Sequence, residues 1–181
     1  MTRSLLTSPV DVEIIAALPE HEPILANMLE LYAHDFSEFK QLRLGADGRF
    51  GYKELPLYWK EFNRYPFLIK AGGHLAGFAF VRRGSEISGD ADVWDMTEFF
   101  ILRGSRRLGV GMKAAHEIWK KFPGKWEVRV IDRNQKAMEF WQRAVNEYLC
   151  KAIEPVPFDK NGEVGMFFRL NAVAPRNNGW Y

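Results

Sequence analysis

The sequence has one cysteine, little net charge and no long run of apolar residues. Because Cys150 is alone, an internal disulfide is excluded. With 25 basic and 23 acidic residues the formal net charge is +2, which is too small a field for non-specific binding to nucleic acid. No stretch reaches the roughly 18 consecutive apolar residues of a membrane-spanning helix, and residues 1–10 lack the pattern of a secretory signal. We therefore expect a cytoplasmic protein with no nucleic-acid partner and no membrane partner.

Aromatic residues, in contrast, are abundant and make up 14% of the chain. The 181 residues are 47% hydrophobic, which is enough for a single domain over residues 1–181 and excludes a disordered or collagen-like chain. Ten of the rings lie between Tyr32 and Phe67, where glycines and prolines break the sequence into irregular segments. Rings usually fill the core. A ring cluster in an irregular segment also suits a binding site, because ring faces attract cations.

The spacing of apolar residues predicts an α/β fold. Pro23 opens a helical pattern, and the Gly72-Gly73 and Asn161-Gly162 pairs predict turns between paired strands. The expected strands are 12–15, 67–69, 75–81, 93–102, 126–131, 148–153 and 164–170, and the expected helices are 23–36, 57–62, 112–122 and 134–144. Cys150 is expected in a strand as a small core residue. Residues 174–181 are expected to form a mobile tail, from which Trp180 and Tyr181 could dock on a neighbouring surface.

The segment from Glu98 to Met112 carries the clearest functional signal. A buried strand turns through Gly109 and Gly111 into the start of a helix. The backbone amides and the dipole at a helix N-terminus favour phosphate, and the glycines let the backbone come close. The same turn supplies guanidinium donors from three residues, Arg103, Arg106 and Arg107. The segment therefore predicts a phosphate-binding turn.

A dinucleotide-binding fold is the competing explanation of this turn. Residues 109–114 match the pattern G-x-G-x-x-G/A, and Asp132 ends the next expected strand. However, about six residues separate the strand end from Gly109, whereas a dinucleotide-binding fold turns at once. Only 49 residues follow Asp132, too few for a doubly wound sheet. An NAD(P)-dependent oxidoreductase is therefore the less supported alternative, and a P-loop is excluded because no Gly-Lys-Ser/Thr follows.

Two motifs in this order indicate a known family. Arg106, Gly109 and Gly111 fill the pattern Q/R-x-x-G-x-G/A. The next helix has the pattern Asn-x-x-Ala-x-x-Phe-Tyr, filled by Asn134, Ala137, Phe140 and Trp141. Over residues 12–170 the sequence resembles the Gcn5-related N-acetyltransferase (GNAT) superfamily. The resemblance implies a mixed, largely antiparallel sheet of about seven strands, splayed beside its central strand and flanked by about four helices.

The resemblance also implies acetyl-CoA as co-substrate, bound by residues 93–145, and a primary amine of a small molecule or peptide as acceptor. Turn amides would hold the pyrophosphate, and strand residues would pair with the pantetheine arm. The next helix would support the cofactor through Asn134 and Trp141. The implied cofactor-binding residues are Phe100, Ile101, Leu102, Arg106, Arg107, Leu108, Gly109, Val110, Gly111, Met112, Asn134 and Trp141.

Acetylation of an amine needs a base, and Glu98 is our candidate. It precedes the residues expected to bind pantetheine, where the family often places a base, and neighbouring rings such as Phe99 would raise its pKa by desolvation. A structural carboxylate paired with an arginine is the alternative role. The family's usual acid is a tyrosine at the position of Trp141, whose indole cannot act as the acid. Water, Tyr32, Tyr148 or another hydroxyl would then protonate the thiolate, or the chain is a non-catalytic acyl-CoA-binding or sensing module.

The acceptor site is expected in the insertion over residues 32–67. Its candidate residues are Tyr32, Phe36, Tyr58 and Trp59. No metal is expected, because the four histidines lack ligand spacing. The nearby aspartates Asp90, Asp92 and Asp95 lack the periodicity of a calcium loop and predict a solvated acidic loop. A homodimer is compatible with the sequence.

Overall fold

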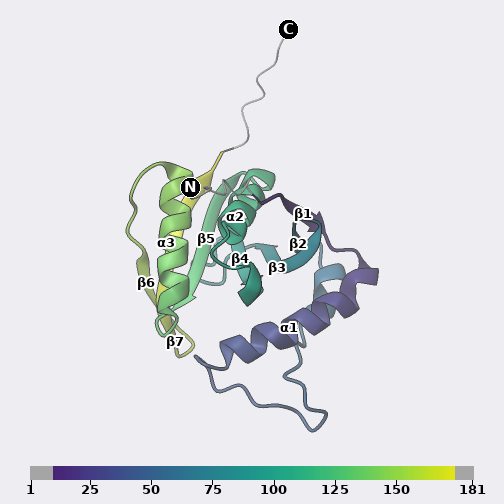
Figure 1. Cartoon of the computed structure of the whole chain (residues 1–181). Coiled ribbons are helices and arrows are strands. Elements are labelled where there is room, and N and C mark those ends of the chain that lie inside the picture. Colours follow the sequence, from purple (N-terminus) through teal and green to yellow (C-terminus); the bar gives the residue numbers. More distant parts are fainter. Residues whose placement is uncertain (1–9, 174–181) are drawn as a thin grey trace, which may run out of the picture.

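The computed structural model describes residues 10–173 of the chain. Within this range the chain forms one mixed sheet of seven strands, three α-helices and three short 3-10 helices (Figure 1). The strands are β1 (Val12–Ala16), β2 (Arg64–Ala71), β3 (His74–Arg83), β4 (Trp94–Ile101), β5 (Gly124–Ile131), β6 (Val156–Lys160) and β7 (Glu163–Ala172). The helices are α1 (Glu22–Phe36), α2 (Val110–Lys121) and α3 (Gln135–Leu149), and the 3-10 helices are η1 (Pro19–His21), η2 (Leu55–Trp59) and η3 (Arg103–Ser105).

The sheet opens between its central strands. Its order is β1-β2-β3-β4-β5-β7-β6, and every neighbouring pair is antiparallel except β4 and β5. These two parallel strands are paired at Trp94–Trp126 and Asp95–Glu127, after which they part. From Met96 onward, the edge of β4 that faces β5 is therefore free of strand pairing within the described chain. The expected splayed, largely antiparallel sheet is confirmed.

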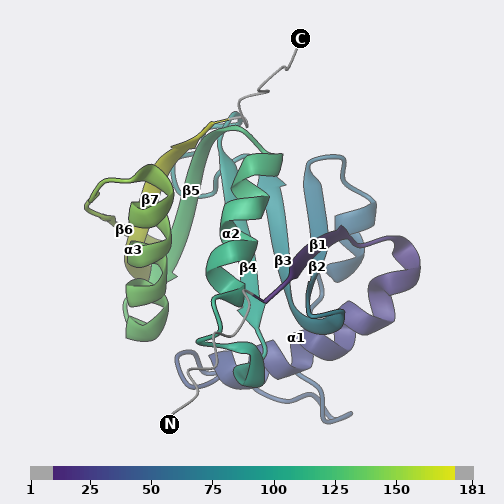
Figure 2. The same ribbon diagram turned by 45° about the horizontal axis from the view of Figure 1, so that its top comes forward.

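The two faces of the sheet carry separate hydrophobic cores. Side chains alternate along β3, so that Phe78 and Phe80 pack with α1, whereas Ala79 and Val81 pack with α2 and α3. Figure 2 shows α2 and α3 side by side along the sheet, with α1 below β2 and β3. The insertion joins the core of α1 through Leu55 and Tyr58. Both faces of β4 are thus fixed by packing, while one of its edges stays free.

Both predicted turns are confirmed, and one predicted helix is shorter than expected. Gly72 and Gly73 connect β2 and β3 with φ of +55° and +80°, and Asn161-Gly162 connects β6 and β7 with φ of +54° and +79°. Positive φ is the reason that glycine or asparagine stands at these positions. The helix expected at 57–62 is the 3-10 helix η2.

The strand expected at residues 148–153 is wrong, because α3 continues to Leu149. Trp141, Ala144 and Val145 form the buried face of α3, and Tyr148 extends the same three-to-four-residue spacing. Cys150 is an exposed C-cap residue with φ of +52°, not a core residue. The next strand, β6, begins at Val156.

The expected tail at 174–181, with Trp180 and Tyr181, lies outside the described residues. Among residues 10–173, no helix is both long and apolar enough to cross a membrane.

Gly77 provides a test of the packing between β3 and β4. A Cβ atom at this position would lie 2.1 Å from the backbone oxygen of Phe100. We expect Gly77→Ala to lower the free energy of unfolding by about 2–3 kcal/mol, as overpacking does, measured by urea denaturation. The control is Gly104→Ala, because a Cβ there meets nothing within 4 Å. Equal stability of the two variants would contradict the close approach of β3 to β4.

Candidate active site

The turn between β4 and α2 has the backbone shape that the sequence predicts. Arg107 and Gly109 adopt φ of +63° and +79°, and Gly109 is the N-cap of α2. The first amides of α2, beginning at Val110, have no partner inside the helix and lie at its positive end. Val110 itself is buried, and its side chain belongs to the core between the sheet, α2 and α3.

Gly111 has a packing role that sequence reasoning missed. A Cβ atom on Gly111 would lie 3.2 Å from Cε2 of Phe140 and 3.4 Å from Cγ1 of Ile101. The absence of a side chain thus lets α2 approach both α3 and β4. This contact accounts for the second glycine of the motif without any ligand.

Two of the three arginines in the turn are held by an aspartate of α1. Arg103 Nη2 lies 2.7 Å from Oδ1 of Asp35, and Arg106 Nη2 lies 2.7 Å from Oδ2. Arg106 also donates from Nε to the carbonyl oxygen of Ile101, at 2.7 Å. Burial acts to raise the pKa of Asp35, but the hydrogen bonds from both arginines outweigh it and lower this pKa. An anion at the turn therefore has to share these guanidinium groups with Asp35.

The free edge of β4 leads from this turn to Glu98. Phe100 and Ile101 are buried and Leu102 is half-buried, so their backbone is the part available at the split. The amide of Leu102 donates to Ala76 of β3 and therefore belongs to the paired edge of β4, whereas the carbonyl of Ile101 accepts from Arg106. The rest of the edge offers donors and acceptors to an extended ligand.

Glu98 lies on the face of β4 that packs with α1, and both its carboxylate oxygens are hydrogen-bonded. The hydroxyl of Tyr32 on α1 donates to Oε2 at 2.6 Å, and the hydroxyl of Tyr52 in the insertion donates to Oε1 at 3.0 Å. Burial raises the pKa of Glu98; the two hydrogen bonds and Arg129 oppose it, and the net pKa is above the ordinary value. A half-buried carboxylate of raised pKa beside an open strand edge suits proton transfer.

A comparison with known proteins identifies the family. The sequence model described as "Acetyltransferase (GNAT) family" matches residues 25–145, which is well over half of the chain. This chain belongs to the GNAT acetyltransferase family. It is therefore an acyltransferase, and its glycine turn belongs to the family signature. The mostly antiparallel sheet also excludes the doubly wound fold that the dinucleotide alternative needs.

Solved structures of GNAT acetyltransferases share this fold at low sequence identity. An acetyltransferase from Thermus thermophilus has a TM-score of 0.67 and 14% identity, with 90% of this chain and 98% of that chain covered. Spermidine N-acetyltransferase from Vibrio cholerae, solved with CoA and spermine, has a TM-score of 0.60 and 13% identity, with 89% and 95% covered. A putative acetyltransferase from Salmonella typhimurium, solved with acetyl-CoA, has a TM-score of 0.58 and 12% identity, with 93% and 98% covered. No curated protein sequence matches the chain.

The second GNAT motif has structural roles in this enzyme. Asn134 is the N-cap of α3, and its Oδ1 accepts a hydrogen bond from the amide of Ala137 at 3.0 Å. Trp141 is 5% exposed and packs against Phe99, with a ring-centroid distance of 5.0 Å. These contacts explain both residues as parts of the fold. Their contact with a cofactor stays a prediction.

The remaining residues of the signature turn differ in exposure. Arg106, Arg107 and Leu108 are exposed, whereas Met112 is half-buried and packs against the core of α2 and α3. Within residues 10–173, no group of histidine, cysteine, aspartate and glutamate side chains is arranged to hold a metal ion.

Of the four aromatic residues expected at the acceptor site, Tyr32 alone is hydrogen-bonded to Glu98 in the described chain. Tyr58 is 2% exposed and its hydroxyl is hydrogen-bonded to Thr97 Oγ1 at 2.7 Å. Trp59 donates from its indole nitrogen to the carbonyl of Ala17, and Phe36 packs beside Tyr32. Tyr52 was not among the expected site residues. Nothing local in the sequence distinguishes it from the other rings, because its contact is with a residue 46 positions away.

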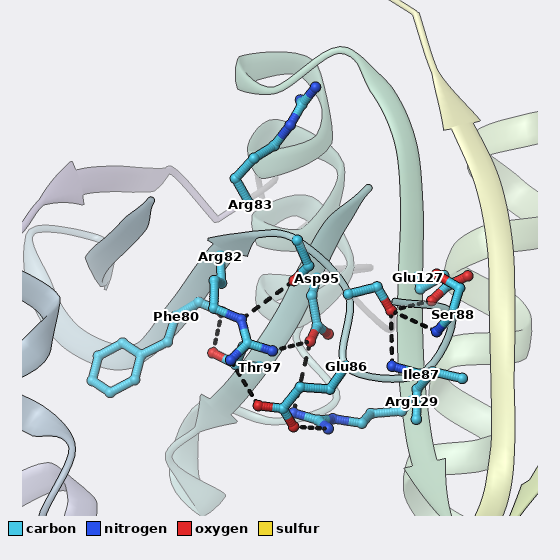
Figure 3. A network of polar contacts seen from close by, with 12 residues as sticks. Phe80, Arg82, Arg83, Glu86, Ile87, Ser88, Asp95, Thr97, Glu127 and Arg129 are labelled. Atoms are coloured by element: carbon cyan, nitrogen blue, oxygen red, sulfur yellow. Dashed lines mark hydrogen bonds and ion pairs between the residues drawn. The ribbon is translucent and has the colours of Figure 1, made fainter. Parts of the chain in front are cut away.

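A network of charged side chains lies where β4 and β5 part (Figure 3). Asp95 is 2% exposed and faces Arg82 at 3.4 Å and Arg129 at 3.7 Å. Glu86, from the loop after β3, pairs with the same two arginines at 2.7 and 2.9 Å. Burial raises the pKa of Asp95 to about 6 despite Arg129 and Arg82. The expectation of a solvated acidic loop is thus wrong for Asp95, because the fold encloses it at the split.

The raised pKa of Asp95 predicts a pH-dependent stability. Because the folded protein holds this proton up to about pH 6 and the unfolded chain only to about pH 4, the contribution of Asp95 to stability falls as pH rises through that window. Relative to Asp95→Asn, we expect the wild-type free energy of unfolding to fall by roughly 2–3 kcal/mol between pH 4 and 6.5. Urea denaturation at several pH values measures the difference. The control Asp159→Asn, at an exposed position, should show the same pH dependence of stability as the wild type. If Asp95→Asn also showed the wild-type pH dependence, the raised pKa of Asp95 would be contradicted.

Proposed function

We propose that this acyltransferase moves the acetyl group of acetyl-CoA to a primary amine of a small molecule or peptide. The observation that carries the proposal is the position of Glu98, on β4 just beyond the last β4–β5 pair and upstream of the phosphate-binding turn. One strand thus connects a candidate base to a candidate anion site. The similar folds of the Vibrio cholerae enzyme, solved with CoA and spermine, and the Salmonella typhimurium protein, solved with acetyl-CoA, support this assignment.

The residues present fit a CoA thioester. The amides of residues 106–112 lie around a helix N-terminus and two positive-φ positions, as an anion site requires. A shallow surface hollow of about 520 Å³ begins at Gly109 in this turn and runs along α2, past His116 and Lys120, to Glu147 of α3. The open edge of β4 around Ile101 would hold the arm by backbone hydrogen bonds, whereas the carbonyl of Phe100 faces β3. Bound there, acetyl-CoA supplies the activated thioester.

Glu98 would accept the proton that the attacking amine loses, directly or through water. Its raised pKa places it nearer the operating pH than an exposed glutamate, which makes it a better base. Tyr32, beside Oε2 of Glu98, would line the acceptor position together with Phe36. Their ring faces suit a cationic amine.

Arg106 tests the anion site. Removing its guanidinium deletes a donor at the turn, so we expect Arg106→Ala to weaken CoA binding about tenfold or more, the loss typical of a charge-assisted hydrogen bond. Isothermal titration of the protein with CoA measures the affinity. Arg143→Ala, an exposed arginine on α3, should bind CoA as the wild type does. Unchanged affinity of Arg106→Ala would argue against CoA phosphates at this turn.

Glu98 tests the chemical step. Glu98→Gln keeps the size and the hydrogen-bond acceptor but cannot take a proton at neutral pH, so we expect the rate to fall by about 100-fold or more while CoA affinity is retained. Thiol release from acetyl-CoA over a panel of polyamines, aminoglycosides and peptides measures the rate. The exposed Glu154→Gln is the control. A wild type that acetylates none of these amines would refute the proposed acceptor class.

A further inference from the structure

The carboxylate of Glu98 is held by residues from two segments outside the sheet. Tyr32 and Tyr52 lie 66 and 46 positions away in the sequence, yet each donates its hydroxyl to a different oxygen of Glu98. Burial and proximity to Glu98 raise the pKa of both tyrosines, so both remain neutral donors. With one donor on each oxygen, the carboxylate cannot rotate without breaking a hydrogen bond.

Tyr32 is fixed by its ring. It packs against Phe36, Phe78 and Phe100 with ring-centroid distances of 5.4, 5.8 and 5.8 Å. Because α1 carries the residue and the sheet supplies two of these rings, the hydroxyl is held in place by packing on two sides. Its position does not depend on the hydrogen bond to Glu98.

Tyr52 is fixed by its backbone, although the insertion around it has little regular structure. Glu30 on α1 accepts hydrogen bonds from the amides of Phe50 and Gly51, at 2.8 and 2.9 Å. Gly51 has φ of +69°, a conformation that favours glycine. The ring of Tyr52 then packs against Phe80 with a centroid distance of 6.0 Å. A carboxylate of α1 thus anchors the loop that presents the second hydroxyl.

The hydroxyls of Tyr32 and Tyr52 lower the pKa of Glu98, whereas its surroundings favour the neutral carboxylic acid. Burial and the nearby Asp95 on β4 both raise the pKa of Glu98, while Arg129 on β5 lowers it. Arg129 is already paired with Glu86 and Asp95, which limits its effect. Tyr32 and Tyr52 are the largest contributions that lower this pKa. Without them, a larger share of Glu98 would carry a proton at neutral pH and could not act as a base.

We propose that Tyr32 and Tyr52 are positioning residues that orient the Glu98 carboxylate and favour its ionised form, and that Glu30 secures Tyr52 for this task. The catalytic consequence rests on the proposed function, whereas the effect on the ionisation of Glu98 does not. The two hydroxyls differ in their surroundings. The pKa of Tyr32 is influenced by Arg129 and Glu163, whereas the pKa of Tyr52 is influenced by Tyr58 and Glu54 of the insertion. Because the proposed function places Tyr32 at the acceptor position, loss of its hydroxyl should also affect acceptor binding.

The direct test measures the pKa of Glu98 in the free protein by carbon-13 NMR of glutamate carboxyl groups. The signal that Glu98→Gln removes is assigned to Glu98. We expect Tyr32→Phe and Tyr52→Phe each to raise this pKa by about one unit, because each removes a hydrogen bond to the charged form. Both variants keep the ring, so the fold is preserved. Tyr65→Phe, whose ring packs with Trp94 and Phe122 in the other core, should leave it unchanged. An unchanged value in both test variants overturns the proposal.

A double-mutant cycle tests Glu30. If Glu30 acts by placing Tyr52, Glu30→Ala should raise the pKa of Glu98 as Tyr52→Phe does, and the combined variant should show no further rise. Independent, additive shifts would overturn the assigned role of Glu30.

Activity supplies the second readout on the intact enzyme. The acid limb of the kcat/KM profile should move to higher pH in Tyr52→Phe with little change in KM, and Tyr32→Phe should also raise KM for the amine. An acid limb that stays in place while the carboxyl pKa shifts would overturn the catalytic part of the proposal. A wild type without amine acetylation but with the expected NMR shifts would refute the proposed function and leave the positioning role supported.

Discussion

The parting of β4 from β5 is the constraint on which the rest of this structure depends. Strands β4 and β5 are paired only at Trp94 and Asp95 of β4. Beyond these residues, one edge of β4 has no neighbouring strand as hydrogen-bond partner. Unpaired backbone groups are costly when they are enclosed. The backbone groups of such an edge need a ligand or water as hydrogen-bond partner. The network of Asp95 with Arg82 and Arg129 stands at the last paired position and ties β3, β4 and β5 together there (Figure 3). Burying these charges carries a desolvation cost, which mutual pairing offsets only in part, as the raised pKa of Asp95 shows.

Helix α1 connects the two halves of the candidate site. Tyr32 and Asp35 lie three residues apart and therefore on the same side of the helix. Tyr32 contacts the candidate base, and Asp35 contacts two of the three arginines in the turn before α2. The position of one helix thus sets the surroundings of the candidate base and of the candidate anion site. The same helix anchors the insertion through Glu30.

The abundant aromatic residues divide between packing and the site. Tyr58 is enclosed in the core beside Phe80, and Trp141 is enclosed beside Phe99. Phe62, in contrast, is 95% exposed. The tyrosines that reach Glu98 combine both functions, because their rings pack while their hydroxyls donate. The ring-rich insertion does supply two hydroxyls to Glu98, although ring abundance did not identify which rings they belong to, and the acceptor site there stays a prediction.

The sequence by itself determined the order of elements, both glycine turns between paired strands, the glycine motif at the start of α2 and the family. These features are local, since they depend on spacing along the chain and on glycines that must adopt positive φ or leave room for a neighbour. The wrong strand prediction at 148–153 also has a local cause, because the apolar spacing of α3 continues through Tyr148 and the helix ends only at Leu149. Tertiary structure alone decided that Tyr52 meets Glu98, that Asp35 holds Arg103 and Arg106, and that Asp95 is buried. Each of these depends on residues far apart in sequence brought together by the sheet and α1. Periodicity reports which face of an element is buried, but it does not specify the residue on another element that it will meet.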